Sequence, residues 1–136
     1  MNCCMNKERI NELYFDFKEA LTRLNEALAQ DLSFGDIVID GTMQRFEFTF
    51  ELAWKLCKAV LTYHGIEAAT PRAVIKEGFA AGFLKDGEGW IDMLEDRNKT
   101  SHIYDAREAL TIYEKIKQKH YSVLETFSNE IMRFAL

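Results

Sequence analysis

Residues 97–104, Arg-Asn-Lys-Thr-Ser-His-Ile-Tyr, place a permanent cation, an imidazole and a phenol within one short segment. An imidazole can be neutral near pH 7 and accept a proton, and a guanidinium can donate two parallel hydrogen bonds to phosphate oxygens. No acidic cluster with metal-ligand spacing accompanies these residues. The combination therefore suits cleavage of a phosphodiester without a metal ion.

The two groups can act together only if the backbone brings them together. On a straight helix, residues five positions apart lie about 7.5 Å apart along the axis and about 140° apart around it, so Arg97 and His102 would diverge. Asn98, Thr100 and Ser101 are poor helix formers, because their side chains offer the backbone alternative hydrogen bonds. We therefore predict that a helix ends or bends within this segment and lets the two side chains converge.

If they converge, each side chain has a clear chemical role. His102 would accept the proton of a ribose 2′-hydroxyl, and Arg97 would stabilise the negative charge that grows on the phosphate. Asn98 would orient the imidazole or the phosphate. Attack by the 2′-oxygen gives a 2′,3′-cyclic phosphate and requires RNA, because DNA lacks that hydroxyl. This chemistry needs no cofactor.

A simpler interpretation remains open at this point. Arg97 could pair with Asp92, Glu95 or Asp96 while His102 caps a helix. In a chain with seven Arg and three His, an Arg and a His with four to six residues between them are expected about 0.5 times by chance. The residues alone therefore favour the simpler interpretation.

The composition indicates a helical protein. The chain has 136 residues, of which 48% are hydrophobic, and contains one Pro and seven Gly, which is too few for the many turns of an all-β fold. No apolar run approaches the length of about 20 residues that crosses a bilayer, and the N-terminus lacks the apolar core of a secretion signal. We expect one domain over residues 1–136.

The cysteines and the net charge indicate where the protein acts and how it could bind RNA. Cys3, Cys4 and Cys57 are odd in number and form neither a disulfide framework nor a zinc pattern, so we expect reduced thiols and a cytoplasmic location. The net charge is −5, with 22 acidic and 17 basic residues. An acidic chain argues against tight non-specific binding to long duplexes, so any contact with RNA should be local.

Apolar residues at three- and four-residue steps predict five helices. We expect long helices over about residues 7–31, 40–64 and 106–134. A short helix should begin at Thr70-Pro71, an N-cap followed by proline at the first helical position, and a second short helix near Gly89 or Trp90 should run into the motif. The predicted fold is an all-α, mostly up-down bundle with three long and two short helices.

The second long helix is apolar on two sides. One stripe comprises Met43, Phe46, Phe50, Trp54, Cys57 and Leu61, and the other comprises Phe48, Leu52, Leu56 and Ala59. In so short a chain, such a helix is expected to be shared between the core and a second copy. Glu47 and Glu51 lie one turn apart on it, and we expect them to be solvated or ion-paired. His64 and His120 lie on apolar stripes, and we expect them to be core or interface residues.

The sequence also resembles a known family. Arg97-Asn98-Lys99-Thr100-Ser101-His102-Ile103-Tyr104 is similar to the Arg-x4-His-x-Tyr signature of HEPN-domain toxins. The helix-two block, residues 41–55 (GTMQRFEFTFELAWK), resembles the family formerly called nucleotidyltransferase substrate-binding proteins, the HEPN half of HEPN–MNT toxin–antitoxin pairs. The similarity covers residues 8 to 134, and the helix-two block is the more specific part.

The resemblance implies an all-α homodimer, in the style of a type VII toxin–antitoxin pair, with the two motif segments facing each other across a cleft. It implies a metal-independent endoribonuclease in which Arg97 and His102 are the catalytic pair and Asn98 is the polar residue after the Arg. Tyr104 matches the residue that a partner MNT nucleotidyltransferase AMPylates to silence the toxin. The alternative is a non-catalytic subunit that binds a nucleotidyltransferase.

Overall fold

The computed structural model describes residues 3–103 and 105–136, and within these ranges all regular structure is helical. The helices are α1 (Cys3–Leu28), α2 (Asp36–Tyr63), α3 (Pro71–Ala80), α4 (Gly87–Lys99), α5 (Ala106–Lys115) and α6 (Tyr121–Glu130). A π-helical segment, Ile116–His120, joins α5 to α6 without a break, and short 3-10 turns cover Leu32–Phe34, Thr100–His102 and Ile131–Ala135. Three long helical stretches and two short helices confirm the predicted all-α bundle.

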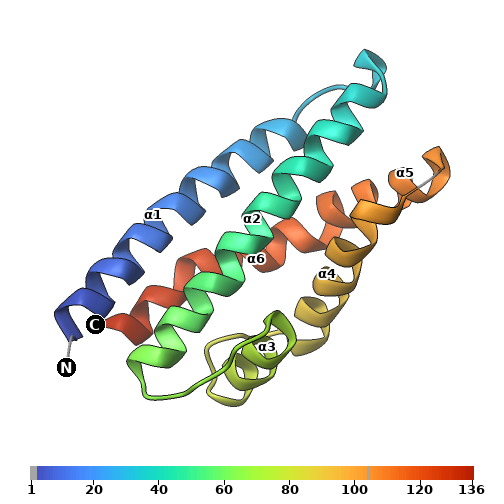
Figure 1. Cartoon of the computed structure of the whole chain (residues 1–136). Helices are drawn as coiled ribbons and strands as arrows, with labels where there is room; N and C mark the ends of the chain where they lie inside the picture. The colour runs from blue at the N-terminus through green and yellow to red at the C-terminus, as the bar shows by residue number, and fades with distance from the viewer. Residues whose placement is uncertain (1–2, 104) are drawn as a thin grey trace.

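The antiparallel helices α1 and α2 extend along the length of the molecule. α1 and α2 run side by side, α5 lies beside the end of α4, α6 passes behind α2, and the chain ends near the start of α1 (Figure 1). The helices α3 and α4 lie on one flank of α2 (Figure 1). None of the described helices is both long enough and apolar enough to cross a membrane.

Local signals set the helix boundaries. Gly65 has φ 80° and ends α2 in the left-handed conformation that glycine adopts without strain. The Thr70 hydroxyl accepts a hydrogen bond from the Ala73 amide at 3.2 Å, and Pro71 begins α3 as predicted. Asp86 caps α4 by accepting from the Gly89 amide at 2.9 Å, so this helix begins slightly earlier than its sequence suggested.

An aromatic cluster joins the long helices. The Trp90 ring on α4 lies 5.1 Å from Phe127 of α6 and 6.1 Å from Phe50 of α2, centroid to centroid, and Phe17 of α1 lies 5.5 Å from Phe127. All four side chains are buried, so each contributes a large apolar area as well as edge-to-face contacts. This cluster fixes the start of α4 against the rest of the bundle.

The second stripe of α2 divides between two environments. Leu56 is completely buried, so it belongs to the core of this chain and not to a surface shared with a second copy. Phe48 is 61% exposed, whereas Leu52 and Ala59 are half-buried. Only the Phe48 end of this stripe therefore presents the apolar surface that its sequence suggested.

Two helical glycines should respond in opposite ways to alanine. A Cβ at Gly78 would lie 2.9 Å from Cys57 Sγ and 3.1 Å from Leu84 Cδ1, whereas a Cβ at Gly41 would meet nothing within 4 Å. We expect Gly78→Ala to lower the free energy of unfolding by about 1–3 kcal/mol through overpacking. Gly41→Ala should raise it by up to about 1 kcal/mol through helix propensity. Urea denaturation of both variants tests this, and a stabilised Gly78→Ala would contradict the packing around α3.

Candidate active site at the end of α4

The motif segment contains a helix end. α4 stops at Lys99, Thr100–His102 form one 3-10 turn, and Ile103 is extended with φ −89° and ψ 122°. The Asp105 carboxylate then caps α5 by accepting from the Glu108 amide at 2.7 Å. The predicted break between Arg97 and His102 is therefore confirmed.

The end of α4 is held against α2 by a threonine. The Thr100 hydroxyl contacts two acceptors, the Glu47 carboxylate on α2 and the Arg97 carbonyl oxygen at 2.7 Å. The second contact satisfies one of the carbonyls that a helix end leaves without a partner. Glu47 thus fixes where α4 stops, a role that its sequence context did not reveal.

Arg97 is held loosely. Its side chain is 32% exposed, and its Nη2 atom lies 4.0 Å from Oε1 of Glu51 on α2. A partly exposed ion pair at this distance contributes at most about 1 kcal/mol. The Arg97 Nε–H is buried and has no acceptor among residues 3–103 and 105–136. The guanidinium therefore keeps donors that an anionic ligand could use, and its partner is Glu51 rather than a carboxylate of its own helix.

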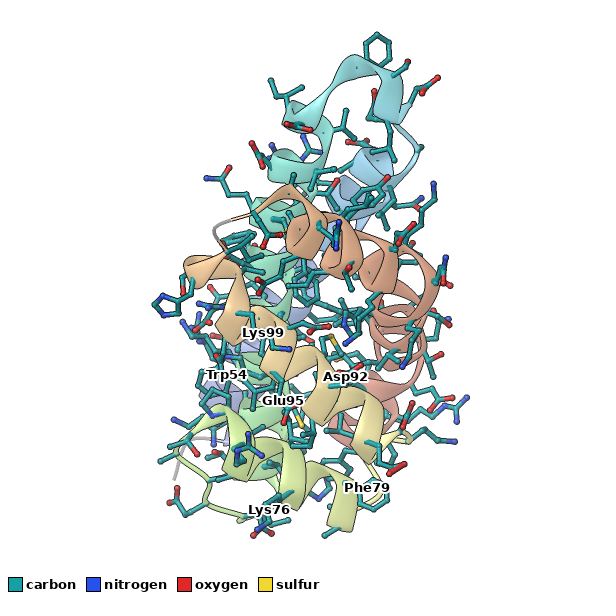
Figure 2. The ribbon with its side chains drawn as sticks, turned by 90° about the vertical axis from the view of Figure 1, so that its right-hand side faces the viewer. Trp54, Lys76, Phe79, Asp92, Glu95 and Lys99 are labelled. Carbon is teal, nitrogen blue, oxygen red and sulfur yellow. The ribbon has the colours of Figure 1, made fainter. Side chains whose placement is uncertain are left out.

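The other motif residues lie on the surface. Asn98 and Lys99 are exposed on the last turn of α4, where Figure 2 labels Lys99, and His102 is exposed on the 3-10 turn. Within the described parts of the chain, no hydrogen bond joins Arg97 to His102. Their convergence stays a prediction, and so do the roles assigned to them and to Asn98. Tyr104 lies outside the described residues.

A buried polar cluster, which was not predicted from the sequence, lies behind the motif. His120 Nε2 lies 2.6 Å from Oδ2 of Asp96, and both residues are about 1% exposed. Lys115 Nζ lies 2.8 Å from a carboxylate oxygen of Asp96 and equally far from one of Asp92. The His120 ring stacks on Phe46 at 5.5 Å. The sequence signal was the pair of acidic residues one turn apart, Asp92 and Asp96, matched by lysines at the same spacing on the last helix.

The charges of this cluster balance one another. Burial raises the pKa of Asp96, but the hydrogen bonds from His120 and Lys115 and the charges of both outweigh it and hold that pKa below its ordinary value. Asp92, Asp96 and His120 offer ligand atoms within 4.8 Å of one another, which is a distance suited to a metal ion. Lys115 already places its ammonium against both carboxylates, so we assign the cluster to structural ion pairing.

Replacing Asp96 tests this assignment. Asp96→Asn should lower the free energy of unfolding at pH 7 by about 3 kcal/mol, because it removes one partner of a buried pair. Since the pKa of Asp96 lies below its ordinary 3.8, the stability from its ionised form is complete above that value and is lost as the pH falls through the lowered pKa. The deficit of the variant should therefore be constant between pH 5 and 7 and shrink in acid.

Denaturation at several pH values measures this deficit. The matched control is Glu95→Gln on the same helix, where the exposed side chain (Figure 2) should change stability by less than about 0.5 kcal/mol. A deficit at Asp96 as small as that of the control would mean that the cluster does not anchor α4.

Comparison with known proteins assigns this chain to a family. The family described as "Nucleotidyltransferase substrate binding protein like" matches residues 12–133. The probable ribonuclease HepT of Haemophilus influenzae is 33% identical over 86 residues, which span 60% of this chain and 59% of that relative. The match therefore covers a little over half of the relative's length.

Two solved structures share the fold. A Thermus thermophilus protein is 29% identical with a TM-score of 0.77, covering 85% of this chain and 98% of that protein. A Haemophilus influenzae protein, described as revealing the fold of a substrate binding domain of a nucleotidyltransferase, is 23% identical with a TM-score of 0.58, covering 89% and 98%. The family match over residues 12–133 confirms the resemblance seen in the sequence, and the chain belongs to the HEPN, nucleotidyltransferase substrate-binding protein family.

Proposed function

We propose that the chain is a metal-independent endoribonuclease toxin of a HEPN–MNT toxin–antitoxin pair. The observation that carries the proposal is the helix end at Lys99, which leaves an incompletely paired guanidinium before the break and an exposed imidazole after it. The Haemophilus influenzae relative is a probable ribonuclease, which supports the same activity class.

The reaction follows from the side chains. His102 accepts the proton of a ribose 2′-hydroxyl, and the 2′-oxygen attacks the adjacent phosphorus. Arg97 stabilises the charge that develops on the phosphate oxygens, and Asn98 on the next position orients the phosphate or the imidazole. The bond to the 5′-oxygen breaks, and that oxygen takes up a proton. The products are a 2′,3′-cyclic phosphate and a 5′-hydroxyl end.

The active form in this proposal is a homodimer. Within the described residues of one chain, Arg97 faces Glu51 and no hydrogen bond connects it to His102, so a second copy facing the motif would complete the site. Large apolar side chains remain exposed on α1 and α2, among them Phe15 and Phe48, each 61% exposed. Burying such side chains is the ordinary driving force for association.

The partner in this proposal is an MNT nucleotidyltransferase that silences the toxin by AMPylating Tyr104. The modified residue would lie two positions after His102 and one before Asp105, the cap of α5. An attached AMP adds bulk and negative charge where the RNA phosphate must bind, so like-charge repulsion excludes the substrate.

A non-catalytic subunit is the second candidate. The family description, substrate binding, favours it, and so does the ion pair between Arg97 and Glu51. In that case the motif binds phosphate without cleaving RNA. Expression without the nucleotidyltransferase separates the two candidates, because only a ribonuclease should arrest growth.

Removing the imidazole tests the mechanism. His102→Ala should slow RNA cleavage by about 100-fold or more, because a general base contributes 10²–10⁴-fold. The matched control is His64→Ala, another exposed histidine, which should keep the wild-type rate. Wild-type cleavage should continue in EDTA and leave cyclic phosphate ends, and cleavage that stops on chelation would exclude this mechanism.

Removing the phenol tests the silencing. With the nucleotidyltransferase and ATP present, wild-type protein should gain the mass of AMP and lose ribonuclease activity. Tyr104→Phe should gain no AMP and remain active under the same conditions, whereas Tyr121→Phe should behave as wild type. Mass spectrometry of tryptic peptides locates the modification, and AMP on any other residue would refute the assignment to Tyr104.

A further inference from the structure

A cationic pocket lies between α1 and α2. It has a volume of about 360 Å³ and is lined by Asn6, Arg9 and Leu13 of α1 and by Trp54, Lys55, Lys58, Ala59 and Thr62 of α2. Three of these eight residues are cations and none is acidic, in a chain whose net charge is −5. A local excess of positive charge on an acidic protein indicates that an anion binds there.

Two of the three cations have no carboxylate partner. No ion pair within the described residues includes Arg9 or Lys58, which is also true of other exposed cations such as Lys76 and Lys117. Arg9 is exposed and Lys58 is half-buried, so both can reach a ligand in the pocket. Ligand binding would compensate charges that the fold leaves uncompensated.

Two ion pairs of Glu51 link a lining residue of the pocket to the motif. Glu51 lies between the two sites, with Oε1 4.0 Å from Arg97 Nη2 and Oε2 3.5 Å from Lys55 Nζ. Lys58 follows Lys55 by three positions and therefore lies beside it on the same face of α2. The cations thus form a series beside α2: Arg97 of α4 contacts Glu51, and Lys55 and Lys58 follow on α2. Arg9 of α1 lines the same pocket as the two lysines.

Trp54 supplies an apolar surface to the pocket. Trp54 is half-buried and lines the pocket, so part of its indole remains accessible (Figure 2). Its Nε1–H is buried and has no acceptor among the described residues, and a ligand oxygen that reached it would add a hydrogen bond. Cations that follow a backbone, combined with an aromatic surface for a base, are how proteins bind single-stranded nucleic acid.

We infer that this pocket is a subsite for single-stranded RNA, in which Lys55, Lys58 and Arg9 bind the phosphates that flank the scissile linkage and Trp54 packs against a base. The inference rests on the proposed ribonuclease activity and extends it to a strand that runs along α2. The series of cations favours a strand over a free nucleotide, because Glu51, the α2 partner of Arg97, precedes Lys58 by seven positions, about 10 Å along the helix axis.

Salt dependence of RNA binding tests the subsite. In a full-length His102→Ala background, which keeps RNA intact, Arg9→Ala/Lys58→Ala should weaken binding of a labelled single-stranded oligoribonucleotide at least 10-fold at low salt. The slope of log K against log salt concentration is negative, and its magnitude should decrease by about 0.7 for each phosphate that the variant no longer neutralises. The matched control, Lys76→Ala/Lys117→Ala, removes two exposed cations from α3 and the π-helical segment, and Figure 2 shows Lys76 well apart from Trp54. It should change neither quantity.

The aromatic contribution is tested separately. Trp54→Leu should weaken binding by about 5- to 150-fold, the range for removal of one base–aromatic interaction. Trp54→Phe keeps an aromatic surface and should retain most of the affinity, which separates base packing from a loss of folding. An unchanged affinity in Trp54→Leu, with thermal unfolding unchanged, would overturn base packing by Trp54.

The outcomes distinguish the subsite from the activity. If wild-type protein cleaves RNA and Arg9→Ala/Lys58→Ala cleaves it with an unchanged KM, the subsite is refuted and the ribonuclease stands. If wild-type protein does not cleave RNA while the double variant loses RNA binding, the activity is refuted and the subsite stands. Tighter binding of ATP than of RNA, or a change of oligomeric mass in the double variant, would assign the pocket to a free nucleotide or to a second copy and overturn the inference.

Discussion

The buried hydrogen bond between Asp96 and His120 determines how the candidate site is presented. Asp96 directly precedes Arg97, and successive residues on a helix point about 100° apart. Once Asp96 is fixed toward the last helix, Arg97 must face α2, where Glu51 lies. Without partners, the buried Asp96 carboxylate would have to take up a proton or this region would unfold. The direction in which Arg97 points therefore depends on Lys115, which pairs with Asp96.

The π-helical segment Ile116–His120 allows the last helix to contribute His120 to the contact with Asp96 and apolar side chains to the core. Regular three- and four-residue steps along residues 106–134 would place Ile116, His120, Val123 and Phe127 on one buried stripe. In the structure the π-helical turn at Ile116–His120 is followed by a completely buried Leu124, whereas Val123 is half-buried, so Leu124 takes the place of Val123 in the stripe. The additional residue lets His120 reach Asp96 while Leu124 and Phe127 still face the core. Such bulges are frequently found at functional positions in helices.

Most of the fold could be predicted from the sequence because it depends on local signals. The long apolar stripe of α1, the cap formed by Thr70, the positive φ of Gly65 and the helix break after Lys99 each depend on a few neighbouring residues. The contacts of the motif depend instead on residues distant in sequence. Glu51 is 46 positions before Arg97, and His120 is 24 positions after Asp96, so neither partner could be assigned by spacing. Only the acidic and basic pairs one turn apart hinted that two helices would meet there.

An acidic protein can still bind RNA at this surface because screening limits how far each charge acts. At physiological ionic strength the Debye length is about 8 Å, so exposed acidic residues on remote faces scarcely affect a phosphate bound between α1 and α2. The carboxylate that matters is Glu51, because it lies between Arg97 and Lys55. In the free protein it holds both cations on one face of α2 through long, weak ion pairs. A phosphate that replaces it as their partner must compete with a nearby negative charge, so this arrangement favours brief, local contacts with a strand over tight binding to long nucleic acid.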